Sequence, residues 1–597
     1  MAAEAHASDG SAAFGVARSF SGRRWAMREG DAETLRALTE TAELSPLLAR
    51  ILAARGVGPD TLGDVLNPTL KRLLPEPLTL KDMDKAIART RTAIEDGGQI
   101  AVFGDYDVDG SSSAALLSGF LSAIGRKPRV YIPDRMTEGY GPNAPALLRL
   151  KEEGAGLVIT VDCGAAAVVP LAAARAAKLD VIVLDHHTVE ALPPAVAQVN
   201  PNQLGDISGL GHLCAAGVTF LFLVALNREL RDSNWYASND VDEPDLMRLL
   251  DLVGLATVCD VVPLIGVNRA FVRAGLARLS TLERPGLAAL ASLCRVTPPF
   301  TPYHLGFVFG PRINAGGRVG RCSLGAELLT ATNADAALAL ARALDMHNRE
   351  RQAIEAIILD EAMAAAALQD NAPFLLAADT GWHPGVVGIV AGRLKDRFGK
   401  PSFVVGFEGE AGRGSARSIP GIDIGAAVRA AHEEGVLDAG GGHAMAAGFS
   451  LRAARLEAFR EFLAAYFMNA SAALTDARAL HLEAALAPSA ATASLVEEIA
   501  RAGPFGAGNP EPLLALPDVR VAFADVVGKD HVRLRLTGGD GSRLDAIAFR
   551  AAGGPLGEGL MAARGRAIHA AGRLRADDWN GRTRVQLQLE DAAPAGA

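Results

Sequence analysis

The sequence is constrained most by a repeated pattern in which a short apolar run, rich in β-branched residues, ends in acidic or histidine side chains. Residues 181–187 read Val-Ile-Val-Leu-Asp-His-His, and residues 100–110, 130–135 and 157–164 repeat the pattern. Apolar runs of this kind are typical of strands buried in a parallel sheet, and ligands of such sheets bind beyond the carboxyl ends of the strands. The pattern therefore predicts an α/β fold in which acidic groups gather along one edge of a parallel sheet.

Helical patterns separate the predicted strands. Residues 113–124 and 168–177 carry helical apolar periodicity between consecutive strands. Strands that alternate with helices in this way form a βαβ series, which we expect from about residue 98 to residue 205. Residues 206–330 are predicted to be mostly helical.

The ends of the predicted strands supply candidate metal ligands. Asp105, Asp107 and Asp109 follow the first strand, Asp162 follows the third, and His186 follows the fourth. Close carboxylates repel one another unless a cation or a proton lies between them. A mixed set of carboxylate and imidazole ligands suits Mn²⁺ or Mg²⁺ better than a metal that prefers thiolates. Two such ions, roughly 3.5–4 Å apart, would stabilise the attacking and leaving oxygens of a phosphoryl displacement.

The spacing of these ligands predicts their directions. On an extended chain, side chains two residues apart point the same way, and adjacent side chains point to opposite sides. Asp107 and Asp109 should therefore face one site. His186 and His187 should diverge, so that one can bind metal while the other meets a phosphate oxygen. Asp162 is the candidate for a ligand shared between two ions.

A further aspartate, Asp260, lies inside the otherwise apolar segment of residues 255–264. Taken alone, it is explained equally well as a helix cap or as a buried hydrogen-bonded carboxylate. A lone Asp-x-Asp or His-His pair is also a weak signal. The specific signal is the ordered set of acidic and histidine motifs after successive strands.

The second half of the chain begins with a segment that contains no helix breaker. Neither Gly nor Pro occurs from residue 326 to residue 372. A helix over residues 334–369 would be about 54 Å long, which exceeds the width of a small domain. We interpret it as a strut that joins two lobes. A coiled coil is the alternative, but no strict heptad repeat is sustained.

A second α/β unit is predicted after Pro373. Its expected elements are strands at residues 374–378 and 402–405 and a helix at residues 385–398. Two glycine-rich segments follow, at residues 414–418 and 440–448, and they contain Arg417 and His443. Glycine allows backbone amides to approach an anion closely, so we interpret these segments as a phosphate or nucleotide site. A flexible loop is the alternative.

In the C-terminal region, apolar and polar residues alternate along short segments, as is typical of β-strands. Five strands are predicted, at residues 519–523, 531–537, 544–549, 567–574 and 583–589. The second of these strands has one apolar face and one face that carries Arg533 and Arg535. Five strands with a basic face favour a small OB-type barrel, a frequent binder of single-stranded nucleic acid. A basic strand face that is merely solvated is nearly as good an explanation.

Composition limits the remaining possibilities. At 597 residues the chain should contain about four domains. The net charge of −9 does not by itself indicate a nucleic-acid binder, although metal-binding carboxylates contribute to it. The five cysteines form no Cys-x-x-Cys pair, which argues against a zinc site or a disulfide framework and predicts the cytoplasm as location. No apolar run is long enough for a membrane helix, and we expect no membrane partner.

The N-terminal region gives weaker signals. It has no basic and apolar export signal, and residues 1–20 are expected to be disordered. Short helices are expected between residues 32 and 95. The cluster of residues 23–25, Arg-Arg-Trp, is interpreted as solvated surface, with contact to a polyanion as the alternative.

With these motifs in place, the chain resembles the DHH phosphoesterase family, named after the motif found here at residues 185–187. More narrowly, it resembles the bacterial RecJ type of single-strand-specific 5′→3′ exonuclease from about residue 25 to residue 590. Further motifs carry the resemblance, and they lie at residues 132–135, 138–141, 310–318, 382–391, 414–418, 440–448 and 504–512. The last of these and the barrel that follows are typical of the RecJ type. The chain departs from the family in Gly316-Gly317 and in a polar segment at about residues 228–244, which we interpret as a surface insertion.

The resemblance implies a DHH domain and a DHH-associated domain joined by a long helix, with a catalytic groove between them, and a C-terminal OB-type barrel. The expected divisions are an N-terminal tail and helical segment (1–75), the DHH catalytic domain (76–330), the connecting helix (331–372), the DHH-associated domain (373–470) and the OB domain (471–597).

The resemblance also implies roles for particular residues. The implied metal ligands are Asp105, Asp107, Asp109, Asp162, His186 and Asp260. His187 joins them in the catalytic set. The residues implied to hold substrate phosphate or to line the groove are Arg135, His187, Arg312, Arg318, Ser415, Arg417 and His443.

The function implied is hydrolysis of single-stranded DNA from its 5′ end to mononucleotides, with two Mn²⁺ or Mg²⁺ ions, in recombination and repair. The alternative is a DHH-family phosphodiesterase that acts on oligoribonucleotides or cyclic dinucleotides. A third interpretation, a binding protein that has lost catalysis, is disfavoured because every expected ligand is present. The family also implies a single-strand-binding protein and a RecQ-type helicase as partners, and we expect a monomer.

Overall fold

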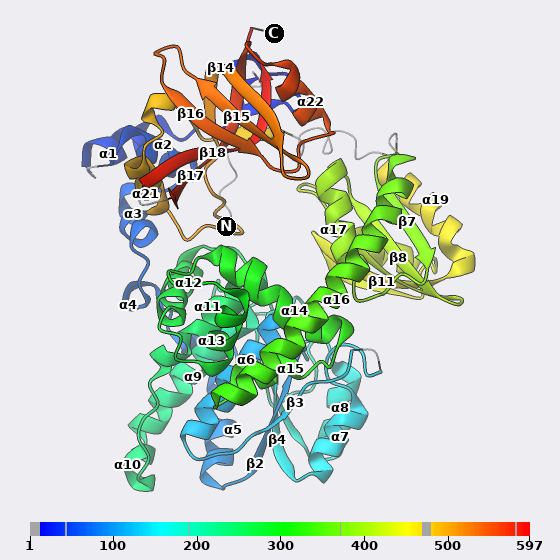
Figure 1. Cartoon of the computed structure of the whole chain (residues 1–597). Coiled ribbons are helices and arrows are strands. Elements are labelled where there is room, and N and C mark those ends of the chain that lie inside the picture. Colours follow the sequence, from blue (N-terminus) through cyan, green and yellow to red (C-terminus); the bar gives the residue numbers. More distant parts are fainter. Residues whose placement is uncertain are drawn as a thin grey trace. The chain divides into compact units, whose positions relative to one another are not determined.

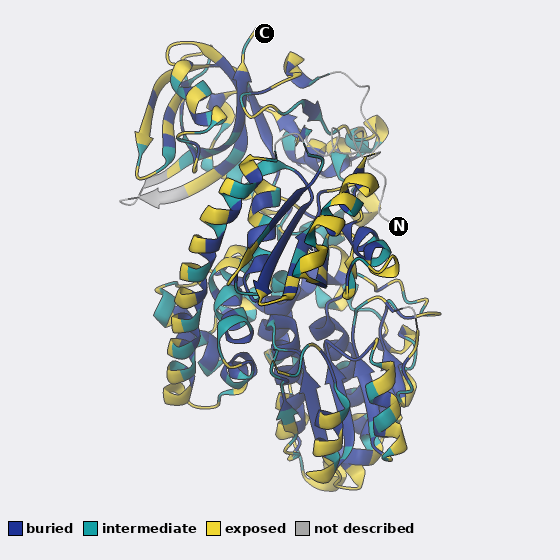
Figure 2. Cartoon of the chain, turned by 90° about the vertical axis from the view of Figure 1, so that its right-hand side faces the viewer, coloured by how far each residue is buried: buried dark blue, intermediate teal, exposed yellow. Residues whose placement is uncertain are grey.

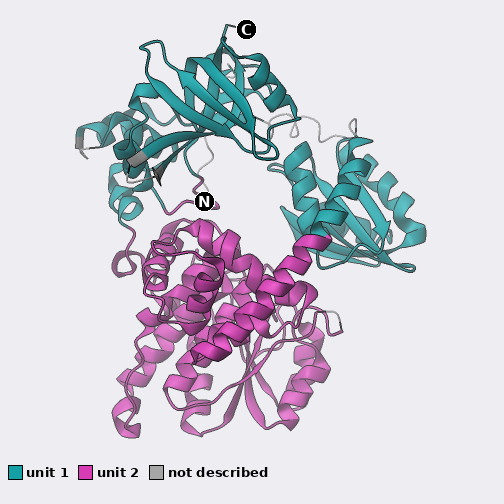
Figure 3. Cartoon of the chain, in the orientation of Figure 1, with its two compact units in different colours: residues 1–67, 355–503, 511–597 teal, residues 68–354, 504–510 magenta. Residues whose placement is uncertain are grey.

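The structure is a computed structural model, and it describes residues 12–41, 44–135, 137–189, 191–369, 372–468, 479–579 and 582–596. The chain divides into two compact units (Figure 3). Unit 1 comprises residues 1–67, 355–503 and 511–597, and unit 2 comprises residues 68–354 and 504–510. Among the helices that the structure describes, none has the length and apolar character needed to cross a membrane.

Unit 2 is built on a five-stranded parallel sheet (Figure 1). Its strand order is β3-β2-β4-β5-β6. The strands are β2 (Gln99–Gly104), β3 (Arg129–Tyr131), β4 (Ala155–Val161), β5 (Asp180–Leu184) and β6 (Ala197–Val199). The four strands expected from sequence are confirmed. The short edge strand β6 was not predicted, because Gln198 interrupts its apolar run.

Both faces of this sheet are covered by helices, which explains why its strands are apolar throughout. Phe103 and Val183 pack on one face with residues of α7 and α8. Val102 and Ile182 pack on the other face with residues of α5, α6 and α9. Figure 2 shows the strands as buried and the outer helix faces as exposed. These helices are α5 (Met83–Glu95), α6 (Val108–Ala123), α7 (Ala144–Glu152), α8 (Val168–Ala176) and α9 (Ala215–Asp232).

The rest of unit 2 is mostly helical, as predicted. Its main helices are α11 (Leu250–Cys259), α12 (Gly266–Leu279), α13 (Pro285–Cys294), α14 (Gly310–Val319) and α15 (Leu324–Thr330). The segment expected to be a surface insertion contains the end of α9 and helix α10 (Trp235–Asn239). Trp235 and Tyr236 are buried there, so this segment is partly core and the expectation of a purely surface insertion is wrong.

The predicted long helix is present as α16 (Ala334–Ala367), which has 34 residues. The boundary between the two units falls within it, at residues 354 and 355. Asn333 caps its first turn, since its side chain accepts a hydrogen bond from the backbone N–H of Ala336 at 2.8 Å.

The second predicted α/β unit is a mixed sheet in unit 1, with strand order β10-β11-β9-β8-β7. Its elements are β7 (Leu375–Thr380), α17 (Val387–Phe398), β8 (Ser402–Glu408), β9 (Ala411–Arg417), α18 (Ile424–Glu433), β10 (Ala439–His443), β11 (Ala446–Arg452) and α19 (Leu456–Phe467). Only β7 and β8 pair in parallel.

The glycine-rich segments of this sheet form strands, so the alternative of a flexible loop is wrong, while their interpretation as a phosphate or nucleotide site stays a prediction. Close packing requires glycine at some of these positions. A Cβ atom on Gly414 would lie 2.3 Å from the ring of Phe449, and one on Gly440 would lie 2.7 Å from Val428 of α18. Glycine clusters therefore mark places here where rings and a helix approach the strands closely.

The C-terminal barrel is confirmed with the five expected strands. These are β14 (Leu514–Val527), β15 (His531–Thr537), β16 (Arg543–Ala548), β17 (Ala567–Trp579) and β18 (Arg582–Pro594), with α22 (Pro555–Ala562) between β16 and β17. The pairing of β14 with both β15 and β17 closes the sheet into a barrel. In β15, Leu534 is buried, whereas Arg533 and Arg535 are exposed as predicted.

The N-terminal segment is part of the same unit as the barrel. Strand β1 (Trp25–Met27) pairs in parallel with β12 (Leu480–Leu482). Trp25 is fully buried, and its indole N–H donates to Asp591 at 3.0 Å. The interpretation of this cluster as solvated surface is therefore wrong for Trp25.

Further contacts fix this N-terminal segment. Arg28 and Arg55 both donate to the buried carboxylate of Glu483, at 3.1 and 2.7 Å. Helices α1 (Ala32–Thr41), α2 (Pro46–Ala54) and α3 (Pro59–Leu66) follow β1. The expected disordered tail falls in part on residues 1–11, which lie outside the described residues. Within the described part, Ala13 and Val16 are buried, which contradicts disorder there.

Candidate active site

The parallel strands of unit 2 place three acidic residues side by side. Each aspartate follows directly after its strand, and its backbone N–H extends the ladder to the next strand. Asp105 donates to Val161 at 3.3 Å, Asp162 to Leu184 at 3.0 Å, and Asp185 to Val199 at 3.1 Å. The carboxyl ends of β2, β4 and β5 therefore meet at one sheet edge, as the sequence pattern predicted.

Asp107 and Asp109 reach the site from a helix. Asp107 caps α6, because its side chain accepts from the backbone N–H of Gly110 at 3.0 Å, and Asp109 lies in the first helical turn. The expectation that both side chains share one face of an extended chain is therefore wrong. Asp109 also accepts hydrogen bonds from the backbone N–H groups of Ala215 and Ala216, at 2.7 and 2.8 Å, at the start of α9.

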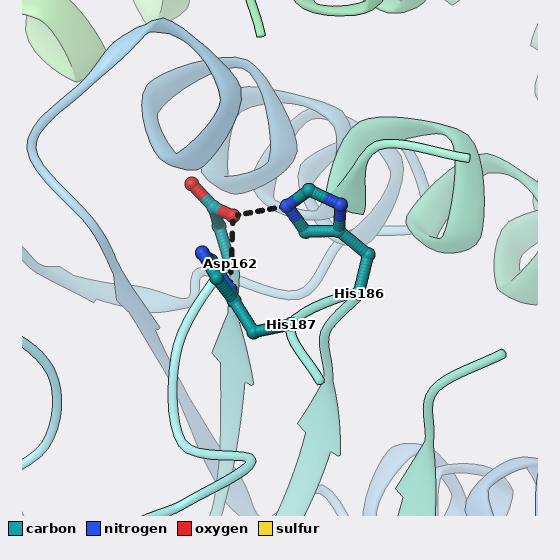
Figure 4. Close-up of side chains that lie close together, drawn as sticks. All are labelled: Asp162, His186 and His187. Atoms are coloured by element: carbon teal, nitrogen blue, oxygen red, sulfur yellow. Dashed lines mark ion pairs between the residues drawn. The ribbon is translucent and has the colours of Figure 1, made fainter. Parts of the chain in front are cut away.

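The side chains converge into one cluster. His186 Nε2 lies 3.5 Å from Asp162 Oδ1 (Figure 4). It also lies 3.7 Å from Asp260 Oδ2 and 3.9 Å from Asp109 Oδ2. Three overlapping groups have their ligand atoms within 4.8 Å of one another, and they are Asp105–Asp107–Asp162, Asp109–His186–Asp260 and Asp162–His186–His187. Asp162 belongs to two of these groups, as a ligand shared between two ions would.

The two histidines do not diverge as expected. Their ring centroids are 4.6 Å apart, and both rings approach Asp162 (Figure 4). The expectation assumed an extended chain, but β5 ends at Leu184 and the histidines lie in the loop that follows. His187 Nδ1 is 2.7 Å from Asp185 Oδ1, which also accepts the backbone N–H of His186 at 2.7 Å.

The cluster contains buried polar atoms that no hydrogen bond satisfies. Within the described residues, Asp105 Oδ1, Asp162 Oδ1, His186 Nε2 and Asp260 Oδ2 have no hydrogen-bond partner. Unsatisfied buried polar atoms are costly, and an ion is one of their standard explanations. The donor set of carboxylate oxygens and one imidazole nitrogen fits Mn²⁺ or Mg²⁺.

Burial and mutual repulsion shift the pKa values of the carboxyl groups. Burial raises the pKa of Asp105, Asp162 and Asp260 well above the ordinary value, and nearby aspartates raise it further. The pKa of Asp109 rises to about 7 through burial and the charge of Asp107. These carboxylates need a proton or a cation between them at neutral pH.

The two histidines are shifted in opposite directions. Burial and the charge of His187 lower the pKa of His186 to about 4, so its imidazole is neutral and able to bind a metal. Burial alone would lower the pKa of His187 as well, but the hydrogen bond and charge of Asp185 raise it to about 9. His187 therefore carries a positive charge at neutral pH.

Comparison with known proteins identifies the family. Three family models match the chain, the DHH family N-terminal domain over residues 99–257, the DHHA1 domain over residues 371–469 and the RecJ OB domain over residues 482–591. The single-stranded-DNA-specific exonuclease RecJ of Bacillus subtilis (strain 168) is 33% identical over 580 residues, which cover 96% of this chain and 71% of that protein. The protein of the same name from Escherichia coli (strain K12) is 34% identical over 571 residues, which cover 93% and 96%. The chain belongs to the RecJ family.

Solved structures of the RecJ family agree with this fold. The crystal structure of RecJ in complex with Mn²⁺ from Thermus thermophilus has a TM-score of 0.78 and 30% identity, and it covers 96% of this chain and 80% of that chain. The structure of the complex with Mg²⁺ from the same organism has a TM-score of 0.73 and 29% identity, covering 96% and 79%. RecJ proteins have thus been crystallised with both of the ions that the donor set fits.

Besides His187, three of the substrate residues expected from the RecJ resemblance lie in unit 2. The Arg135 guanidinium stacks over the Tyr106 ring, 5.3 Å from its centroid, and its charge acts on Asp105. Arg312 donates to Asp345 of α16 at 2.9 Å, so it is partly engaged within the protein. Arg318 lies in the last turn of α14.

The other expected substrate residues lie together in unit 1. Ser415 and Arg417 project from the same face of β9, because they are two residues apart on a strand. A Cβ atom on Gly388 would lie 3.2 Å from both side chains, which places them against the first turn of α17. His443 ends β10, and it pairs with Ala446, which also pairs with Arg417 on the other side of β11.

Some residues of the site lie in the motifs found in the sequence but were assigned no role there. Asp185 contacts both histidines, through their backbone N–H groups and through His187 Nδ1, and it also accepts a hydrogen bond from the backbone N–H of Ala165 at 3.0 Å. Tyr140 donates its hydroxyl to the backbone oxygen of Asp162 at 3.0 Å, and Asn314 accepts from the backbone N–H of Val108 at 3.1 Å. All three lie inside motifs of the RecJ resemblance, which was the available signal.

Proposed function

We propose that this RecJ-family chain is a metal-dependent exonuclease that hydrolyses single-stranded DNA from its 5′ end and releases mononucleotides in recombination and repair. The observation that carries the proposal is the cluster at the carboxyl edge of the unit 2 sheet. There, buried oxygens of Asp105, Asp162 and Asp260 and the Nε2 atom of His186 lack hydrogen-bond partners among the described residues.

In this proposal, Asp105, Asp107, Asp109, Asp162, His186 and Asp260 hold a pair of Mn²⁺ or Mg²⁺ ions. The chemistry that such a pair supplies is activation of water and neutralisation of charge on the phosphate. Asp185 fixes the orientation of His187 through the 2.7 Å contact with its Nδ1 atom. The positive charge of His187, whose pKa is raised to about 9, then faces a substrate phosphate oxygen.

We assign recognition of the 5′ end, which sets the direction of digestion, to unit 1. Ser415 and Arg417 lie against the first turn of α17, a helix of 12 residues. Helix N-termini favour anions, and a guanidinium adds charge-assisted hydrogen bonds to phosphate. We assign this cradle to the terminal 5′-phosphate, with His443, Arg135, Arg312 and Arg318 contacting other phosphates of the strand.

The barrel provides a surface for the single strand. Arg533 and Arg535 project outward from β15, and the Arg533 guanidinium lies 5.6 Å from the centroid of the half-exposed Phe523 ring. Basic and aromatic side chains together bind single strands through phosphate contacts and base stacking.

The decisive test digests single-stranded DNA labelled at either end, with Mn²⁺ or Mg²⁺, beside a blunt duplex and an RNA strand. We expect immediate release of a 5′-labelled mononucleotide and a shrinking ladder from the 3′ label. Asp162→Asn should lower the rate by about 10²–10³-fold or more, the range for losing one electrostatic stabiliser.

Asp180→Asn is the matched control, because Asp180 begins β5 at the opposite edge of the sheet and pairs with Arg89 at 2.6 Å. It should retain the rate. If the protein hydrolysed short RNA or cyclic dinucleotides but not long single-stranded DNA, the chain would instead be assigned to the other DHH phosphodiesterase activity.

Arg417 allows a separate test of end recognition. Arg417→Gln should lose about 2 kcal/mol of binding to a 5′-phosphorylated strand, roughly a 30-fold rise in KM, and little with a 5′-hydroxyl strand. Arg413→Gln is the control, since Arg413 lies on the same strand face, about 13 Å away at 3.3 Å per residue. An equal loss of binding to the 5′-phosphorylated and the 5′-hydroxyl strand would refute the assignment of Arg417.

The resemblance to RecJ also underlies the proposed partners, a single-strand-binding protein and a RecQ-type helicase, and the proposed monomeric state and cytoplasmic location. All five cysteines are free, which agrees with a reducing compartment. Light scattering on the purified chain, alone and mixed with each partner, tests the monomer and the partners directly, and a dimeric chain or an absence of complexes would contradict them.

A further inference from the structure

Two candidate ligands of the metal site come from distant parts of the chain. His186 follows β5 and Asp260 ends α11, yet their side-chain atoms Nε2 and Oδ2 lie 3.7 Å apart. Neither atom has a hydrogen-bond partner among the described residues, so their separation is set by the backbones that carry them.

Asn202 holds the backbone on the histidine side. Its amide group donates to the carbonyl oxygen of His186 at 2.6 Å and to that of Gly211 at 3.2 Å. The backbone N–H of Asn202 donates in turn to the side chain of the fully buried Asn200 at 2.8 Å. This arrangement ties the loop after β5 to Gly211.

Asn268 holds the backbone on the aspartate side. Its amide group donates to the carbonyl oxygen of His212 at 2.7 Å and to that of Pro263, three residues after Asp260, at 2.9 Å. Asn268 is completely buried near the start of α12. Asn202 binds the carbonyl oxygen of Gly211 and Asn268 binds that of the adjacent His212, so residues 211 and 212 connect the two sides of the site.

We propose that Asn202 and Asn268 form a clamp that fixes the spacing between His186 and Asp260 and thereby sets the affinity of the site for divalent cations. A primary amide suits this role because it offers two N–H donors, and each asparagine uses them to bridge two carbonyl oxygens from different loops. Both are positioning residues, and neither is assigned contact with metal or substrate. The inference rests on the proposed metal site.

The test measures Mn²⁺ binding to the metal-free full-length protein, with free Mn²⁺ followed by its electron paramagnetic resonance signal. Asn268→Leu keeps similar volume but removes both donors. We expect Mn²⁺ binding to weaken about 10–100-fold, the range for residues that orient metal ligands. The Mn²⁺ concentration for half-maximal hydrolysis should rise by the same factor, while kcat at saturating Mn²⁺ returns towards that of the wild type.

Asn227→Leu separates positioning from general loss of stability. Asn227 is also a buried asparagine with two side-chain hydrogen bonds, donating to Glu243 and accepting from Tyr236. It lies on α9, about 18 Å along the helix from Ala215 at 1.5 Å per residue. This variant should lose thermal stability but bind Mn²⁺ like the wild type. Equal weakening of Mn²⁺ binding by both variants would overturn the clamp.

Asn202→Ala provides a second, partly exposed position if Asn268→Leu folds poorly. The two asparagines restrain the adjacent residues Gly211 and His212, so the double variant should weaken Mn²⁺ binding by less than the product of the two single effects. A simple product would show that they act independently and would overturn the clamp.

Failure of the clamp and failure of the proposed function give different results. If the wild-type protein binds no Mn²⁺, the metal site itself is refuted. If the wild type binds Mn²⁺ and Asn268→Leu binds it equally well, only the clamp is refuted.

Discussion

Asp109 accepts two backbone hydrogen bonds at the start of α9 and also faces His186 and Asp260. The hydrogen bonds favour its ionised form, whereas burial and the charge of Asp107 favour its protonated form more strongly, and its pKa rises to about 7. The same carboxylate must release that proton when a cation binds. Stability and metal binding are therefore linked to pH at this residue.

The first prediction concerns the metal-free protein. Below about pH 4, Asp109 is protonated in both the folded and the unfolded chain. Between about pH 4 and pH 7 the folded state retains a proton that the unfolded state has released, so stability should fall as pH rises through this window. Adding Mn²⁺ should raise Tm increasingly towards the upper end of the window.

Thermal unfolding with EDTA or with Mn²⁺ across this pH range measures the effect. Asp109→Asn removes one of the titrating carboxyl groups and should make the pH dependence of the metal-free protein less steep between pH 4 and pH 7. A Tm that depends on pH identically with and without Mn²⁺ would contradict the prediction.

The sequence predicted which acidic residues gather in the site, but it did not predict the residues that position them. Strand periodicity placed Asp105, Asp162 and His186 at one sheet edge because parallel strands end together. The predicted side-chain directions were wrong for Asp107 and His187. Asp107 caps a helix and His187 lies in a loop, whereas the spacing rule assumes an extended backbone. The asparagines could not be predicted, since they bind carbonyl oxygens of loops whose paths depend on tertiary packing.

At the scale of elements, helix α6 is held unusually close to the end of β2. A Cβ atom on Gly110 would lie 2.5 Å from the backbone oxygen of Asp105. The glycine thus permits the approach that brings Asp107 and Asp109 of the helix start to Asp105 of the strand end.

Gly110→Ala should therefore displace α6, weaken Mn²⁺ binding and reduce stability, by about 1–3 kcal/mol as for other overpacked sites. Urea unfolding and Mn²⁺ titration measure both effects. Gly119→Ala in the same helix is the control, because its nearest contact would be Leu249 at 4.0 Å. Alanine should there stabilise the protein by up to about 1 kcal/mol. Equal behaviour of the two variants would contradict the role of Gly110.

Element prediction succeeded where periodicity was long and failed where glycine obscured it. The parallel strands, the 34-residue helix α16 and the barrel strands follow from their patterns. Strands β9, β10 and β11 were not predicted as strands, because glycines such as Gly414 and Gly440, which make room for side chains packed against them, obscure the alternation. Sequence alone does not show which ring or helix a glycine accommodates.

At the scale of the whole molecule, unit 1 is assembled from segments far apart in the chain. The N-terminal strand β1 pairs with β12, and Trp25 inserts beside Asp591 of the barrel. Nothing in the sequence pattern indicates this pairing, since β1 has three residues and its partner strand begins only at Leu480.

Trp25→Ala should destabilise unit 1 by about 3–5 kcal/mol, the usual cost of emptying a buried aromatic site. Trp25→Phe retains most of the packing and should lose about 1 kcal/mol with the N–H···O bond. Hydrogen exchange of the barrel strands reports the loss, and strands β2, β4 and β5 of unit 2 should be unaffected. Unchanged protection in the barrel of Trp25→Ala would contradict an integral N-terminal segment.

The pairing of Trp25 with Asp591 has a consequence during translation. The two residues are separated by 566 positions, so at cellular rates of about 5–20 residues per second the ribosome adds Asp591 roughly 30–110 s after Trp25. During that interval a large apolar ring and the unpaired edge of β1 are exposed to the cell. The N-terminal segment is thus synthesised early but acquires its last packing partner late. We therefore expect this apolar surface to need chaperone protection in the nascent chain.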